Sequence, residues 1–269
     1  MRCMVDGREA SMVAADDRGL AYGDGLFETM LARGNAVALW PRHFARLALG
    51  CARLRLPPPD RGQLETELAT LLTGWNDCVV RLTLTRGAGA AGYAAAASPC
   101  TRILAAREVP RLPRRVDELG IALATSEVRL AEQPLLAGIK HLNRLEQVLA
   151  RSLDPDAAEL LMLDASGRVV GASAANVFVV VDGALATPAL ERCGIAGVAR
   201  AAIVARLGAT IRDIEVDELR RASEIFLSNA VRGVVPVASL ADRRYGVGPA
   251  AAAARAALAA EGFEPPRAA

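Results

Sequence analysis

The sequence predicts a protein of the α/β class, of the α+β type, built from two domains. At 269 residues the chain is long for one domain and comfortable for two. Segments with helical periodicity and segments with strand alternation follow one another along its whole length. The stretch PRLPRR, residues 110–115, sets two prolines among charges and predicts an exposed linker. We therefore expect an N-terminal α/β domain over 1–109, a linker over 110–120 and a C-terminal domain over 121–269.

The N-terminal domain is expected to contain two helices. Residues 1–40 should form short strands and turns, because glycines interrupt the stretch DRGLAYGDGLFETM. Apolar side chains at helical spacing predict a helix over 42–55, and leucines three and four apart predict another over about 62–73. Alternating apolar residues predict two strands, at 78–85 and 101–107.

The C-terminal domain shows the same mixture, with strands in the majority. Helical patterns predict four helices, over 143–152, 198–207, 217–221 and the alanine-rich C-terminal stretch. Apolar alternation between turn signals predicts strands, at 121–125, 159–164, 167–173, 176–181, 184–188, 210–215 and 224–228. The pairing is expected to be mainly antiparallel. Neither a GxGxxG after a first strand nor a GxxxxGK[ST] occurs, so a nucleotide-binding fold is not expected.

Composition excludes several classes of function. A formal net charge of +2 provides no basic field for nucleic acid, and no run of eighteen apolar residues indicates a membrane span. The N-terminal stretch MRCMVDGREA lacks the apolar segment of a signal peptide, so we expect a cytoplasmic protein. Two histidines, His43 and His141, cannot build a His-rich metal site, and no metal is expected. Five cysteines without a CxxC pair are expected to be reduced structural thiols.

A single lysine, Lys140, stands among 31 arginines. Arginine cannot be deprotonated in a protein, whereas a lysine can become a neutral nucleophile or base when burial disfavours its charge. Lys140 lies between a turn glycine and a predicted helix in GIKHLNRLEQVLAR, where its side chain can point into an interior cleft. It is therefore a candidate for chemistry. Composition alone leaves open that one surface lysine survived by chance.

Two segments and one arginine offer places for a phosphate group. The stretch CGIAG leads directly into a predicted helix, whose first backbone N–H groups and dipole attract anions. The stretch SNA follows the EIFL strand and adds further backbone donors. Arg46, on the first predicted helix, can form a bidentate clamp on an anion. Each feature alone is also compatible with an ordinary helix start or a solvated arginine.

Taken in this order, the segments resemble the fold-type IV pyridoxal-phosphate (PLP) enzymes. This family includes aminodeoxychorismate lyases and the branched-chain and D-amino-acid aminotransferases, and the similarity runs from DRGLAYGDGLFET to SNAVRGVVPV. The stretch GIKHLNRLEQVLAR resembles the lyases more than the aminotransferases. The resemblance implies that Lys140 forms the Schiff base with PLP. It also implies a set of cofactor-phosphate ligands, namely Arg46, the amides of Ile195 and Ala196, and the SNA segment at Asn229 and Ala230.

The resemblance to the lyases implies a reaction and an assembly. The expected reaction converts 4-amino-4-deoxychorismate to 4-aminobenzoate and pyruvate, a step of folate biosynthesis, in a homodimer. Arg81 and Arg86 are the candidates for binding the substrate's carboxylates, because planar bidentate donors suit them. Gly171 departs from the family, which carries there a glutamate that pairs with the pyridine nitrogen of PLP. An aminotransferase of the same fold, or a catalytically weak PLP-binding homologue, therefore remains as an alternative.

Overall fold

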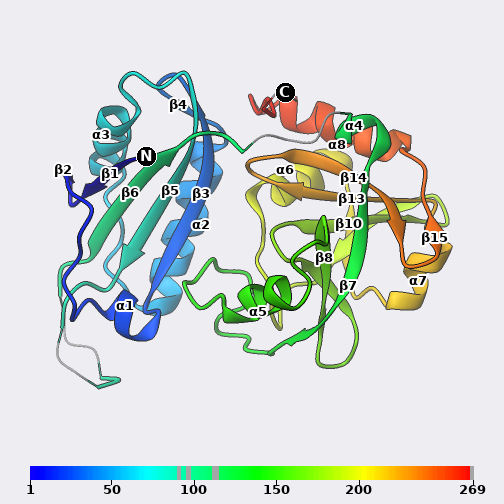
Figure 1. Ribbon diagram of the computed structural model, residues 1–269, viewed down its shortest axis with the longest axis horizontal. Coiled ribbons are helices and arrows are strands. Elements are labelled where there is room, and N and C mark those ends of the chain that lie inside the picture. The colour runs from blue at the N-terminus through cyan, green and yellow to red at the C-terminus, as the bar shows by residue number, and fades with distance from the viewer. Residues whose placement is uncertain (90–91, 95–97, 111–114, 267–269) are drawn as a thin grey trace. The chain divides into compact units, whose positions relative to one another are not determined.

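The computed structural model describes residues 1–89, 92–94, 98–110 and 115–266, and the chain divides into two compact units (Figure 1). One unit comprises Met1–Pro110 with Ile139–Asn143, and the other comprises Arg111–Gly138 with Arg144–Ala269. The segment that contains Lys140 therefore packs with the N-terminal unit. The sequence analysis did not predict this, because it placed the whole of 121–269 in the C-terminal domain. Residues 111–114 of the expected linker lie outside the described residues.

The first unit contains an antiparallel sheet in the order β2-β1-β6-β5-β3-β4. Its strands are β1 (Arg2–Val5), β2 (Arg8–Glu9), β3 (Gly25–Arg33), β4 (Ala36–Val37), β5 (Asp77–Thr85) and β6 (Thr101–Arg107). The segment 139–143 pairs with the start of β3: the Phe27 amide donates to the Lys140 carbonyl over 2.9 Å, and the Leu142 amide donates to the Gly25 carbonyl over 3.0 Å. Main-chain hydrogen bonds thus fix the backbone of Lys140 to β3.

Two long helices, α2 (Trp40–Leu54) and α3 (Arg61–Leu72), pack on this sheet and confirm the two predicted helices. On α2 the buried side includes His43, Leu47 and Cys51. A Cβ atom on Gly50 would lie 2.8 Å from Leu26 of β3, so glycine permits the close approach of helix to sheet. A short helix, α1 (Arg18–Tyr22), was not predicted, because five residues are too few to show a period.

The second unit contains a mostly antiparallel sheet in the order β12-β11-β10-β13-β14-β7-β8-β9, with β15 paired to β14. Its strands are β7 (Ile121–Leu130), β8 (Glu159–Asp164), β9 (Val169–Ala172), β10 (Asn176–Val181), β11 (Ala184–Pro188), β12 (Thr210–Arg212), β13 (Glu224–Asn229), β14 (Gly233–Leu240) and β15 (Arg243–Arg244). The sequence analysis missed β14, which contains Pro236. Pairing of β14 with β7 begins only at Val237, so the proline lies where β13 alone pairs with the strand.

The helices of the second unit are α4 (Val116–Leu119), α5 (Leu145–Leu153), α6 (Val198–Leu207), α7 (Val216–Arg221) and α8 (Pro249–Ala259). Apolar side chains of the sheet, among them Leu161, Val177 and Ile225, form a buried core with Leu219 of α7. None of the described helices is long and apolar enough to span a bilayer. The predicted fold class, a mixed α/β protein of the α+β type in two units, is confirmed.

Candidate active site

Lys140 lies against the aromatic ring of Phe27. Its Nζ is 4.2 Å from the ring centroid, within the range of a cation–π interaction. Phe27 is 7% exposed and Lys140 is half-buried, so the amine sits at a partly desolvated position on the sheet and not at the end of a solvated side chain. The structure therefore gives the only lysine a defined position, as a chemical role requires.

Arg81 lies against the same ring. Its Cζ is 4.0 Å from the centroid of Phe27, and the residue comes from β5, where it pairs with Thr29 of β3. Arg81 is exposed, but partial desolvation of its guanidinium by the protein lowers its pKa, and the nearby cation of Arg107 lowers the pKa further. Among the described residues Arg81 has no hydrogen-bond or ion-pair partner.

Arg46 forms a buried ion pair with Glu28. The Arg46 Nε donates to Glu28 Oε1 over 2.8 Å, and Arg46 Nη2 donates a second hydrogen bond to Glu28 Oε2. His43 Nδ1 lies 2.6 Å from Glu28 Oε2, and all three side chains are at least nine-tenths buried. Burial raises the pKa of Glu28, but the Arg46 charge and the hydrogen bonds from His43 and Arg46 outweigh it and lower that pKa to about 2.

The sequence analysis named Arg46 but missed Glu28, and it considered His43 only as a metal ligand. A signal for Glu28 was present. Strand alternation puts it on the same side of β3 as Leu26 and Met30, so a carboxylate falls at a position that faces the helices. A charge at such a position needs a partner, and Arg46 supplies it.

The pH dependence of stability should show that His43 is neutral in the native protein. Burial lowers the pKa of His43 below the ordinary 6.5 despite its contact with Glu28, so the native ring is neutral. As pH falls below 6.5, the unfolded chain binds a proton at this histidine and the native chain does not, so the free energy of unfolding decreases. The free energy of unfolding, measured in urea at pH 7.5 and 5.5, is expected to drop less in His43→Asn than in the wild type. An equal drop in both would contradict the neutral native state.

The turn before α6 is the expected phosphate site, and Asn176 of β10 holds it. The Asn176 side chain donates to the Ile195 carbonyl over 2.8 Å and accepts from the Gly197 amide over 3.1 Å. A Cβ atom on Gly197 would lie 2.0 Å from the Asn176 oxygen, so this position requires glycine. The Ala196 amide donates to the Gly138 carbonyl over 3.0 Å, whereas the Ile195 amide has no acceptor among the described residues.

Ser228 of β13 provides a second donor near this turn. Its hydroxyl is 1% exposed and has no hydrogen-bond partner in the described structure. Ser228 pairs directly with Asn176 across the sheet, so both side chains lie on the same face. A buried hydroxyl without a partner is unfavourable unless a ligand supplies one. The unpaired hydroxyl, the Ile195 amide and the start of α6 thus form a set of donors that suits an anion.

Asn229 and Ala230, the residues expected at the cofactor, lie just beyond Ser228. The Asn229 side chain accepts from the Val231 amide over 3.0 Å and from the Arg232 amide over 2.8 Å. It also donates to the Ala174 carbonyl over 3.2 Å. The side chain of Asn229 therefore shapes its own turn, and the sequence analysis, which named the segment, passed over Ser228.

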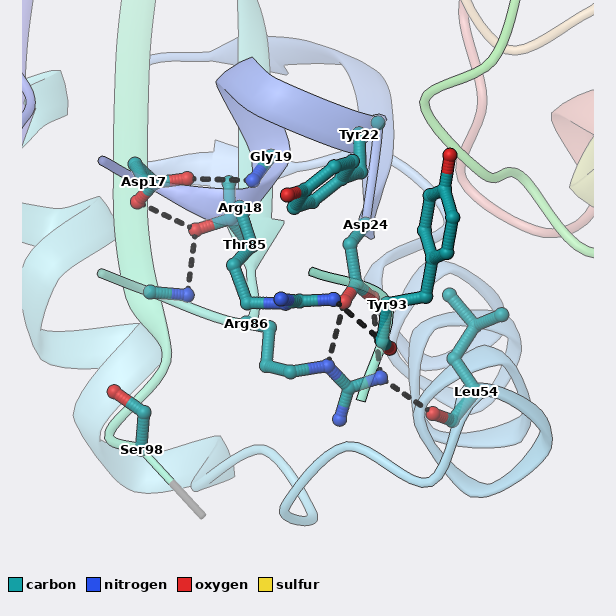
Figure 2. Close-up of polar contacts among 12 residues, drawn as sticks. Asp17, Arg18, Gly19, Tyr22, Asp24, Leu54, Thr85, Arg86, Tyr93 and Ser98 are labelled. Carbon is teal, nitrogen blue, oxygen red and sulfur yellow. Dashed lines mark hydrogen bonds and ion pairs between the residues drawn. The ribbon is translucent and has the colours of Figure 1, made fainter. Parts of the chain in front are cut away.

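The side chain of Arg86 is hydrogen-bonded to other residues of the protein, whereas we expected it to bind the substrate (Figure 2). It donates to Asp24 through Nε over 2.7 Å and through Nη2 over 3.0 Å. It also donates to the carbonyls of Leu54 and Arg55, over 2.8 and 3.1 Å, at the C-terminal end of α2. Arg18 donates to the same carboxylate, through Nε to Asp24 Oδ2 over 3.1 Å, and to the Gly92 carbonyl over 2.8 Å. Arg86 thus caps a helix and joins it to α1.

Replacing Asp24 should loosen this whole cluster. Burial raises the pKa of Asp24, but the hydrogen bonds from Arg86 and Arg18 prevail and leave it lowered, so the carboxylate is charged. Asp24→Asn removes the charge that two arginines share, and we expect a loss of about 2 kcal/mol in the free energy of unfolding. Urea denaturation measures it. Glu118→Gln, which breaks the exposed pair with Arg115, is the control and should cost less than about 0.5 kcal/mol.

Gly171 lies in β9 opposite Met162 of β8, and two buried carboxylates, Glu159 and Asp164, stand at the two ends of β8. Asp164 accepts from the amides of Ser166 and Arg168 and pairs with the Arg168 side chain, so it builds a turn. Glu159 is 4% exposed and accepts a very short hydrogen bond from the hydroxyl of Ser173, two residues beyond Gly171. The structure therefore places the two carboxylates that the sequence could not: Asp164 in its own turn and Glu159 at Ser173.

Cys51, Cys78 and Cys193 are buried, free cysteines. Burial raises the pKa of Cys51 to about 12 and that of Cys78 and of Cys193 to about 11, so these free thiols stay protonated. In the part of the chain that the structure describes, no group of three or more His, Cys, Asp or Glu side chains could hold a metal ion.

Comparison with known proteins places these residues in a family. The pattern of the family described as amino-transferase class IV matches residues 25–240. The crystal structure of 4-amino-4-deoxychorismate lyase from Pseudomonas aeruginosa is 45% identical, with a TM-score of 0.90 over 95% of this chain and 97% of that one.

Two curated relatives have similar lengths. The aminodeoxychorismate lyase of Vibrio harveyi is 31% identical, over 88% of this chain and 90% of the relative. A putative branched-chain-amino-acid aminotransferase of Methanocaldococcus jannaschii is 32% identical, over 87% of this chain and 84% of the relative. The chain therefore belongs to the class IV aminotransferase family, the PLP-dependent enzymes of fold type IV.

Proposed function

We propose that the protein is an aminodeoxychorismate lyase, which converts 4-amino-4-deoxychorismate to 4-aminobenzoate and pyruvate in folate biosynthesis. One observation carries the proposal more than any other: the single lysine of the chain is fixed to β3 and positioned at Phe27, in a protein 45% identical to the Pseudomonas aeruginosa lyase along 95% of its length. The aminotransferase relative and the Vibrio harveyi lyase are almost equally similar, at 32% and 31% identity, but the lyase is covered over more of its length, 90% against 84%. A solved branched-chain aminotransferase is more distant, at 23% identity.

The residues present fit PLP. The unpaired Ser228 hydroxyl, the Ile195 amide and the start of α6 offer donors for a phosphate. Gly138, which pairs with this turn, precedes Lys140 by only two residues. Lys140 would hold the cofactor's aldehyde carbon. Arg46, Ala196, Asn229 and Ala230 remain proposed phosphate ligands, although Arg46, Ala196 and the Asn229 side chain already have partners within the protein.

When bound, PLP supplies an aldehyde that captures amines and a ring that withdraws electrons. The chain supplies the proton transfer. Of the two cations at Phe27, only Lys140 can give up its proton, because a guanidinium stays charged. The neutral Nζ of Lys140 removes the proton from the substrate carbon that bears nitrogen. The bond between the ring carbon and the ether oxygen then breaks, and the ring of the product becomes aromatic. The leaving group departs as the enolate of pyruvate and takes up a proton to give pyruvate.

A direct assay tests this function. Purified protein loaded with PLP should be yellow, and borohydride should fix a pyridoxyl group on the peptide that contains Lys140. With 4-amino-4-deoxychorismate it should release pyruvate and 4-aminobenzoate in equal amounts. Amino transfer from a branched-chain or D-amino acid to 2-oxoglutarate, without pyruvate release, would establish the aminotransferase instead. A yellow protein with neither activity would be the weak PLP-binding homologue that Gly171 permits.

We also propose a homodimer in the cytoplasm. Four large apolar side chains of α5, namely Leu145, Val148, Leu149 and Leu153, are 55–74% exposed, which is unusual for a helix surface facing water. Burying them against a second copy would remove this exposure. The free thiols are in keeping with a reducing compartment. Sedimentation equilibrium should give twice the chain mass of 28.2 kDa.

A further inference from the structure

Arg200 is a buried cation in the first turn of α6. The residue is 7% exposed, and it follows the first helical residue, Val198, by two positions. Its Nε donates to the Thr187 hydroxyl over 3.1 Å, and its Nη2 donates to the Pro188 carbonyl over 2.9 Å. Both acceptors are neutral. The two hydrogen bonds therefore hold the guanidinium at the end of β11 without compensating its charge.

The position of Arg200 is unfavourable for a cation. Among the described residues it has no carboxylate partner, whereas Arg18, which is 4% exposed, forms an ion pair with Asp24 over 3.1 Å. Desolvation lowers the pKa of Arg200, and in the described structure no charged neighbour raises it. The first turn of a helix is also the positive end of its dipole, where a second positive charge is repelled. An anion at the start of α6 would relieve both the burial of an unpaired charge and this repulsion.

The turn before α6 has donors for such an anion. The side chain of Asn176 occupies the Ile195 carbonyl and the Gly197 amide. The Ile195 amide has no acceptor among the described residues, and the buried Ser228 hydroxyl has no partner there. These donors are neutral, although a phosphate monoester carries almost two negative charges at neutral pH. The balancing charge on this helix is that of Arg200, in the turn that begins the helix.

We propose that Arg200 supplies the buried positive charge that balances the anion at the start of α6, namely the phosphate of PLP. This inference rests on the proposed function and extends it, because it names the residue that makes the site prefer a phosphorylated cofactor to an unphosphorylated one. Arg200 is a positioning residue. Its hydrogen bonds to β11 fix the guanidinium, and its charge acts on the anion through the protein interior, where salt screens little. Arginine suits this role because it stays charged when buried.

The test compares the affinities for PLP and for pyridoxal, which has no phosphate, in the full chain freed of cofactor. Arg200→Met removes the charge and keeps the length of the side chain. It should weaken PLP binding about 5- to 30-fold and change pyridoxal binding less than about twofold. Arg206→Met is the control, because Arg206 is an exposed arginine in the last turn of the same helix. In this control the ratio of the two affinities should change less than about twofold.

Two further variants separate the charge of Arg200 from its hydrogen bonds. Arg200→Gln keeps a donor for β11 without the charge, so it should bind PLP as weakly as Arg200→Met does, and it serves in place of Arg200→Met if that variant does not fold. Arg200→Lys keeps the charge without the planar fork and should bind PLP within about threefold of the wild type at pH 7. Inorganic phosphate gives a readout that does not depend on Lys140: it should raise the urea midpoint of the wild type more than that of either neutral variant.

Three results would overturn the role of Arg200. An equal loss of affinity for PLP and pyridoxal in the neutral variants would mean that the residue only supports the fold. Unchanged PLP affinity in these variants would mean that its charge does not reach the anion. Binding of PLP by Arg200→Lys as weak as that by Arg200→Met would assign the effect to the hydrogen bonds. If the wild type binds neither PLP nor pyridoxal, the proposed function fails, while the titration with inorganic phosphate still decides whether Arg200 balances an anion.

Discussion

Replacing Lys140 by arginine is expected to abolish activity, with a loss of at least about 10³-fold in kcat. The substitution keeps the positive charge and the aliphatic stem beside Phe27, but a guanidinium cannot become a neutral nucleophile. Lys140→Ala should lose activity to the same extent. Both variants should lose the yellow colour of the covalently bound cofactor, as measured by absorbance, while circular dichroism shows an unchanged fold.

The composition of the chain makes this experiment unusually decisive. Because Lys140 is the only lysine of the sequence, the chain's α-amino group is the other primary amine that borohydride reduction could label. Mass spectrometry of the digested protein therefore distinguishes two peptides. Added methylamine should restore part of the activity of Lys140→Ala, because it replaces the missing amine, and should not help Lys140→Arg, whose side chain fills the space. A fully active Lys140→Arg would refute the role of the amine.

Much of the fold could be predicted from local pattern, because most elements are long enough to show a period. The strand over Thr101–Arg107 and the helix over Val198–Leu207 were predicted to the residue. The pattern failed at α1 and at α4, which lies inside the expected linker, because both helices are too short to show a period. It also failed at β14, where Pro236 argues against a strand and pairing with neighbouring strands decides.

The site shows the same division between local and distant causes. Lys140 could be found because its chemistry differs from that of arginine, whatever the fold. Arg81 and Arg86 could not be told apart, since they are five residues apart at the end of one strand. Residues distant in the sequence give the two arginines different environments: Asp24 forms an ion pair with Arg86, and the ring of Phe27 lies against Arg81. Likewise, no local signal joins Glu28 to Arg46 and His43, which come from the next helix.

Glu28→Gln is expected to have the largest effect on stability, a loss of about 3–5 kcal/mol in the free energy of unfolding. Glu28 is 1% exposed, and the substitution leaves the guanidinium of Arg46 buried without its carboxylate. It also removes the partner of His43. Because the native pKa of Glu28 is about 2 and its ordinary value is 4.5, this stabilisation is present above pH 4.5 and lost as pH falls toward 2. Urea denaturation of the protein without PLP, at pH 7.5 and pH 4, measures both effects.

A double-mutant cycle separates the ion pair from binding of the cofactor. Glu28→Leu combined with Arg46→Met replaces both charges by apolar groups, so it should be more stable than Glu28→Gln alone, since no buried charge is left unpaired. If Arg46 also binds the phosphate of PLP, this double variant should bind PLP more weakly while its affinity for pyridoxal, which has no phosphate, stays unchanged. An equal loss of affinity for PLP and for pyridoxal would mean that Arg46 does not bind the phosphate and only holds α2 on the sheet. A double variant as unstable as Glu28→Gln would show that the buried charges are not what the substitution disturbs.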